Sequence, residues 1–117
     1  MVGGNARWRI ERRSPINGAL LAAAVSNPSA RNDIANGVAV GPTGIYVVGS
    51  DITLGNSRWR IEKRSLAALA PIWVVTSNPS VGTDTAMSVA RDATGIYVVG
   101  SDQVPGNLRW RIEKRTP

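Results

Sequence analysis

The chain has 117 residues, with 14 Lys and Arg against 8 Asp and Glu, a formal net charge of +6, and no His, Cys or Phe. The missing His and Cys exclude a thiolate nucleophile, a disulfide, an imidazole base and the usual ligands of zinc, haem and iron–sulfur clusters. A hydrophobic content of 43% is typical of a folded rather than a disordered chain.

Three segments of nearly identical sequence begin at Asn5, Asn56 and Asn107, so the chain repeats with a period of 51 residues. Residues 5–55 and 56–106 align without gaps and are identical at 27 positions, with the blocks RWRIE, SNPS and TGIYVVGSD in register. We therefore divide a single module, residues 1–117, into repeat one (5–55), repeat two (56–106) and a partial third repeat (107–117).

Four short strands are predicted in each repeat, because apolar and polar residues alternate or β-branched residues cluster between turn residues. In repeat one they are expected at residues 8–12, 19–25, 38–40 and 45–49. In repeat two they are expected at residues 58–63, 72–76, 87–90 and 96–100, and a further strand at 108–115 opens the third repeat. The alanines of residues 20–25 would also suit a helix, but the equivalent residues 72–76 carry Trp and β-branched residues, which favour a strand.

Residues 7–30 resemble a secretory, even a twin-arginine, signal peptide, since Arg12 and Arg13 precede an apolar run that ends at Val25. The same pattern recurs at residues 62–80, where a cleaved leader cannot lie. We therefore expect no signal peptide here, and the run is too short to span a bilayer. The cellular location is left open.

The blocks GVAVGPTGIYVVGSD (37–51) and VARDATGIYVVGSD (89–102) resemble the bacterial and archaeal β-propeller repeat family, which is akin to NHL and kelch-type blades. The resemblance implies an all-β fold in which each repeat contributes one four-stranded antiparallel blade, with RWRIEKRS and the apolar strand after it as the two outer strands. Trp73 stands where tryptophan-docking blades carry their Trp, although repeat one has Ala22 there. The resemblance implies no particular activity, because propellers serve as enzymes, lectins and protein-binding platforms.

Two repeats are too few for a closed propeller, which has roughly four to eight blades. The four strands of a blade are named a to d from the inside outwards. Along the chain we then expect strands c and d of a first blade, all four strands of a second blade, and strands a, b and c of a third. We expect the chain to associate with itself head-to-tail, as a six- or eight-bladed ring of three or four chains ahead of an open filament. A neighbour would donate the missing outer strand, residues 19–25, and either residues 7–13 or residues 108–115 would then be surplus.

Arginines flank a Trp in every repeat and are the first candidate binding residues. Repeated around a ring, they would bind an anionic ligand or nucleic acid through phosphate contacts and stacking. Alternation favours a structural role instead. It places Trp8, Trp59, Trp110 and Ile61 inward. It places the arginines on the other face, where they would pair with Glu62 and its equivalents across blades. Basic residues are spread through the repeats, so nucleic acid is not expected as a partner.

Carboxylates at the strand ends are the second set of candidates. Asp51 and Asp102 end strands, and Asp33 and Asp84 precede strands, where they would bind Ca²⁺ or sugar hydroxyls. Their neighbours offer too few oxygens for a calcium loop, so turn capping is favoured. The candidate ligand-binding residues are Arg58, Arg60, Arg109, Arg111, Asp51 and Asp102, and the structural or assembly residues are Trp8, Trp59, Trp110, Ile61, Tyr46, Tyr97 and Trp73.

The leading functional expectation is a structural or interaction module, a two-blade propeller fragment that assembles into a multi-bladed ring. The alternative is a multivalent propeller that binds a glycan or an anionic ligand, and a third reading is an open filament-forming subunit. An enzyme is not expected, because no nucleophile–base pair can be assigned and the glycines lack the spacing of a phosphate loop. No catalytic, cofactor-binding or metal-binding residue is predicted.

Overall fold

A computed structural model describes residues 4–53, 55–105 and 107–117. Within these ranges the chain forms strands and no helix, which confirms the all-β class. In the same ranges there is no helix long and apolar enough to cross a membrane. The strands are β1 (Trp8–Arg13), β2 (Leu20–Ser26), β3 (Ile34–Gly41), β4 (Gly44–Asp51), β5 (Arg58–Arg64), β6 (Pro71–Ser77), β7 (Thr85–Asp92), β8 (Gly95–Val104) and β9 (Asn107–Arg115).

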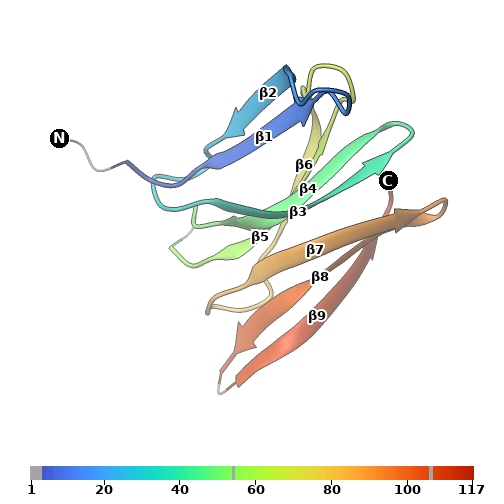
Figure 1. The fold of residues 1–117 in the computed structure, drawn as a ribbon. Coiled ribbons are helices and arrows are strands. Elements are labelled where there is room, and N and C mark those ends of the chain that lie inside the picture. Colours follow the sequence, from blue (N-terminus) through green and yellow to red (C-terminus); the bar gives the residue numbers. More distant parts are fainter. Residues whose placement is uncertain (1–3, 54, 106) are drawn as a thin grey trace.

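The strands form three antiparallel sheets that follow one another in chain order (Figure 1). The N-terminal sheet is the hairpin β1-β2, the central sheet is β3-β4-β5-β6, and the C-terminal sheet is β7-β8-β9. All the predicted strands are present, and β3 and β7 are longer than expected because they begin at Ile34 and Thr85. The division into two, four and three strands agrees with the strand order expected from the sequence.

Glycine allows two backbones to approach closely at the start of β3 and of β7. The register of β3 on β4 shifts between Ala35 and Gly37, and that of β7 on β8 shifts in the same way between Ala86 and Ser88. A Cβ atom on Gly49 would overlap the carbonyl oxygen of Ile34, and one on Gly100 would overlap that of Thr85. These β-bulges therefore require the glycine of each Val-Val-Gly-Ser-Asp block.

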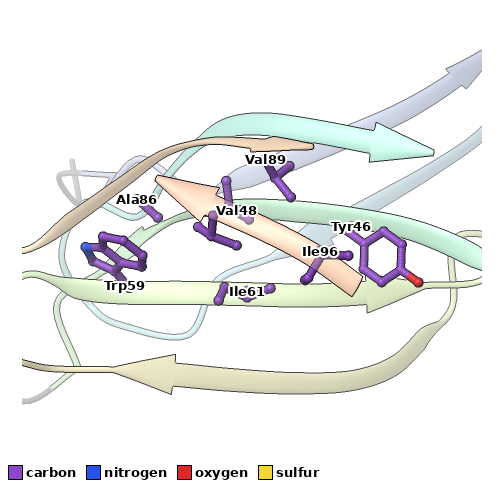
Figure 2. Packing of buried hydrophobic residues seen from close by; sticks show 8 residues of the cluster. Tyr46, Val48, Trp59, Ile61, Ala86, Val89 and Ile96 are labelled. Atoms are coloured by element: carbon purple, nitrogen blue, oxygen red, sulfur yellow. The ribbon is translucent and has the colours of Figure 1, made fainter. Parts of the chain in front are cut away.

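The largest hydrophobic cluster joins the central sheet to the C-terminal sheet (Figure 2). Side chains that alternate along each strand face the neighbouring sheet. The central sheet contributes Tyr46, Val48, Trp59 and Ile61, and the C-terminal sheet contributes Ala86, Val89, Ile96 and Val98. Trp73 packs against this cluster, with its ring centroid 6.1 Å from that of Tyr46.

A second cluster joins the N-terminal hairpin to the opposite face of the central sheet. Trp8 and Ile10 of β1 pack there on Ile45 and Val47 of β4, and Leu69 from the β5–β6 turn completes the cluster. The central sheet therefore has an apolar layer on both faces, one covered by the C-terminal sheet and the other covered in part by the N-terminal hairpin.

Candidate functional site

A tryptophan hydrogen bond joins each sheet to the next. Trp8 donates its Nε1–H to the backbone oxygen of Ser50 at 3.2 Å, and Trp59, 51 residues later, donates to the backbone oxygen of Ser101 at 2.9 Å. Both indoles are buried, so the bond satisfies a donor that would otherwise lose its water. The two inter-sheet contacts are built alike.

The C-terminal sheet ends in an uncovered apolar face. We define the C-terminal face as Tyr97, Val99, Leu108, Trp110 and Ile112, which lie on β8 and β9. Trp59 is 0% exposed and its equivalent Trp110 is 92% exposed; Ile61 is 0% exposed and Ile112 is 69% exposed. The same residue types are thus core side chains in one sheet and surface side chains in the next.

A second uncovered apolar region lies beside the N-terminal hairpin. A hollow of about 760 Å³ opens between β1 and the strands β3 and β4. We define the N-terminal hollow by the residues Ala35, Val38, Val40, Ile45 and Val47, together with the edge of β1. Val38 is 59% exposed here, whereas its equivalent Val89 is 8% exposed under the central sheet.

The candidate ligand-binding residues of the central sheet form ion pairs with one another. Arg58 Nε lies 2.8 Å from Asp51 Oδ1, and Arg60 Nη1 lies 3.3 Å from Asp51 Oδ2, with Asp51 fully buried. Burial acts to raise the pKa of Asp51, but hydrogen bonds from Arg58 and Thr53 outweigh it, and the pKa lies below its ordinary value. These two arginines are mostly buried and already hold a carboxylate.

The equivalent cluster near the chain end is looser. Arg109 Nε lies 2.6 Å from Asp102 Oδ1, but Arg111 Nη1 lies 3.7 Å from Asp102 Oδ2. This buried Oδ2 atom has no hydrogen-bond partner, whereas that of Asp51 bonds to Arg60. Both arginines are also more exposed than Arg58 and Arg60.

The prediction that arginines pair with glutamate across blades is wrong for Glu62, because its arginine partners lie on its own strand. Arg60 and Arg64 bind Glu62 along the same strand, at 2.7 and 2.8 Å, because residues two apart on a strand lie on one face. A serine crosses between the sheets instead: Ser26 Oγ donates to Glu62 at 2.6 Å. Burial acts to raise the pKa of Glu62, but the hydrogen bonds from Ser26 and both arginines lower it overall.

The same arrangement recurs around Glu113, which binds Arg111 and Arg115 and accepts a hydrogen bond of 2.8 Å from Ser77 Oγ. Ser26 and Ser77 were not among the candidates from the sequence. Both are the first serine of the repeated Ser-Asn-Pro-Ser block. That this serine is the same in both repeats was the sequence signal that could have identified them.

The strand-end carboxylates cap turns. Asp33 and Asp84 are buried, and each accepts hydrogen bonds from the hydroxyl and backbone N–H of a serine four residues earlier, Ser29 and Ser80. Tyr97 is half-buried and donates its hydroxyl to Asp92 at 2.8 Å. The hydrogen bonds from Thr94 and then Tyr97 hold the pKa of Asp92 far below its usual range.

Comparison with known proteins found no matching family model, curated protein or solved structure. The geometry of the two apolar end regions is therefore the basis for assigning a function.

Proposed function

We propose that the chain is a structural or interaction module of the β-propeller type, in which the central sheet is one blade, the two end sheets are partial blades, and copies of the chain associate head-to-tail. One observation carries this proposal. Most residues of the C-terminal face and of the N-terminal hollow are the repeat equivalents of the residues on the two sides of the contact between the central and C-terminal sheets.

The first side is the C-terminal face. Tyr97, Val99, Trp110 and Ile112 are the equivalents, 51 residues later, of Tyr46, Val48, Trp59 and Ile61, which form the central sheet's side of the buried cluster. Val48 is 0% exposed and Val99 is 39% exposed. The residues that hold the next sheet are therefore repeated on a sheet that has none beyond it in the described chain.

The second side is the N-terminal hollow. Ala35, Val38, Ile45 and Val47 are the equivalents, 51 residues earlier, of Ala86, Val89, Ile96 and Val98. Trp8 and Ile10 already cover Ile45 and Val47, while Ala35 and Val38 remain exposed. A second copy that presents its Tyr97 and Val99 would bring to Val38 the contacts that Val89 receives from Tyr46 and Val48.

Contacts between two different faces are heterologous, and they close into a ring or extend as a filament. The N-terminal sheet of one copy and the C-terminal sheet of the next would together make one blade, so each chain would supply two blades. Three or four chains in a ring would then give the six or eight blades of a closed propeller. An uncovered apolar face on a soluble domain is also a recognised mark of a protein–protein contact.

The test is the native mass of the full chain and of two single variants, Val38→Lys and Val99→Lys. Both side chains are exposed in the single chain, so each variant should fold. We expect the wild type to form a multi-chain particle and each variant alone to remain a single chain. Ile16→Lys, at a position that is exposed in the β1–β2 turn, is the matched control and should assemble.

Mixing the two variants tests the head-to-tail direction. Each keeps one intact half of the interface, so a mixture should form a two-chain complex and stop there. A wild type that stays a single chain at every concentration overturns the proposal. A mixture that shows no two-chain complex overturns the pairing of the C-terminal face with the N-terminal hollow.

A further inference from the structure

We propose further that β9 is the strand that gives way on assembly, and that β1 of a second copy takes its place beside β8. This inference rests on the proposed head-to-tail association. In the single chain, β9 occupies the edge of β8 with which β1 of the second copy would pair.

The repeat makes β1 and β9 competitors. Both are equivalent to β5, which lies in the central sheet between β4 and β6. In the described chain β1 pairs only with β2, so its other edge lacks the strand that corresponds to β4. One repeat later that strand is β8, and its edge is already paired with β9.

The register of the exchanged pair follows from the register in the chain. Val48 lies opposite Ile61 and Val99 opposite Ile112, so Val99 would lie opposite Ile10 of the second copy. This placement puts Val99 into the N-terminal hollow, next to Val38 of that copy. With β9 still in place, β1 and β9 would occupy the same position.

Burial favours the release of β9 over the release of β1. Trp8 and Ile10 are buried, Trp8 bonds to Ser50, and the guanidinium of Arg60 lies 5.9 Å from the Trp8 ring centroid. Removing β1 would break all of these contacts. On β9, by contrast, Trp110 and Ile112 are exposed already, so its release exposes little additional apolar surface.

The ion pairs also favour the release of β9 over the release of β1. The buried Asp102 Oδ2 on β8 has no hydrogen-bond partner while β9 is bound, and Arg111 stays 3.7 Å away. The matching contact between Asp51 and Arg60, in the four-stranded sheet, is 3.3 Å. A buried carboxylate oxygen without a partner is costly, so the ion pairs between β8 and β9 are less favourable than those between β4 and β5. In the exchanged sheet Asp102 would face Arg7 and Arg9 of the second copy.

The first experiment is Trp110→Ser, with native mass as the readout. If β9 leaves, Trp110 stays in water in the assembly, and the variant should assemble as the wild type does. If β9 stays and β1 leaves, Trp110 becomes the equivalent of buried Trp59, and the variant should lose assembly. Loss of assembly in Trp110→Ser therefore overturns the inference.

The second experiment locks β9 in place. The chain has no Cys, so Val99→Cys with Ile112→Cys creates a single disulfide between residues directly opposite each other on β8 and β9. We expect the oxidised variant to remain a single chain and the same sample, once reduced, to assemble. An oxidised variant that assembles as well as the reduced one shows that β9 need not leave.

A cross-link between copies gives the positive result. Val99→Cys combined with Ile10→Cys should form intermolecular disulfides on oxidation, because the exchange places these two residues opposite each other. Absence of the cross-link in an assembled sample overturns the exchange and leaves head-to-tail association standing. Absence of assembly in the wild type overturns the proposed function instead.

Discussion

Trp59 on β5 donates its indole N–H to the backbone oxygen of Ser101 on β8, 2.9 Å away, and so joins the central sheet to the C-terminal sheet. The same residue type one repeat later, Trp110, is almost wholly exposed. A tryptophan side chain therefore has one role inside the stack of sheets and another at its end, with the same neighbours along its strand.

The first prediction compares these two tryptophans. Trp59→Ala removes a fully buried ring and its hydrogen bond, and it should lower the free energy of unfolding by about 3–5 kcal/mol. Trp110→Ala removes an exposed ring and should change it by no more than about 0.5 kcal/mol. Urea denaturation measures both in the Val38→Lys background, which is expected to remain a single chain, and equal losses would contradict the burial pattern.

The second prediction concerns the buried glutamate between the first two sheets. Glu62→Gln removes the carboxylate partner of Arg64 and one of the two carboxylate partners of Arg60, both nearly buried, and should cost about 3 kcal/mol. Glu11→Gln is the matched control, since Glu11 pairs with Arg9 and Arg13 in the same way on an exposed face. Pairs of this exposed kind contribute little, so the control should unfold close to the wild type.

The third prediction is the response to acid. The pKa values of Asp51, Glu62 and Glu113 all lie below their ordinary values in the folded chain, against the raising effect of burial, because arginine, serine and threonine donors bind the ionised forms. A lowered folded pKa adds stability that is fully present above the ordinary pKa and is lost as the pH falls through the folded pKa.

The melting temperature should therefore be flat from neutral pH down to about 5 and should fall below pH 4.5, the ordinary pKa of Glu. Glu62→Gln should show a shallower fall, since one of the three carboxylates is gone. A wild-type melting temperature that rises on acidification would contradict the direction of these pKa shifts.

The fourth prediction tests the bulge glycines. Gly100→Ala would push a Cβ atom into the carbonyl oxygen of Thr85, and it should destabilise the chain by about 1–3 kcal/mol. Gly49→Ala should behave in the same way, because it meets the carbonyl of Ile34. Gly4→Ala, where a Cβ meets nothing within 4 Å, is the control and should be neutral in thermal melts.

Much of the fold could be predicted because strand formers, turn residues and the repeat all indicate the same elements. The inward position of Trp8, Trp59 and Ile61 follows from simple alternation. The beginnings of β3 and β7 could not be predicted, since Ile34–Asn36 and Thr85–Met87 carry no clear alternation and their pairing depends on the bulges.

The candidate site was only partly predictable. Alternation places Trp110 on the same side of its strand as Trp59, but nothing local to either residue says that only one of them is covered. That difference arises from the next sheet, which packs on β5, whereas no sheet within the described residues packs on β9. The serine bonds to Glu62 and Glu113 were likewise hidden, because they join residues 36 apart that only stacking brings together.

The tryptophan bond recurs between successive sheets, whereas the bulge glycine recurs within them. The same side chain therefore joins one sheet to the next at both contacts in the chain. In the proposed assembly, the rotation between successive sheets, and with it the number of sheets in a full turn, would depend on a single kind of interface rather than on the whole assembly. A change made at the equivalent position of every repeat would alter that rotation by equal increments and would select a wider or narrower closed assembly, or none.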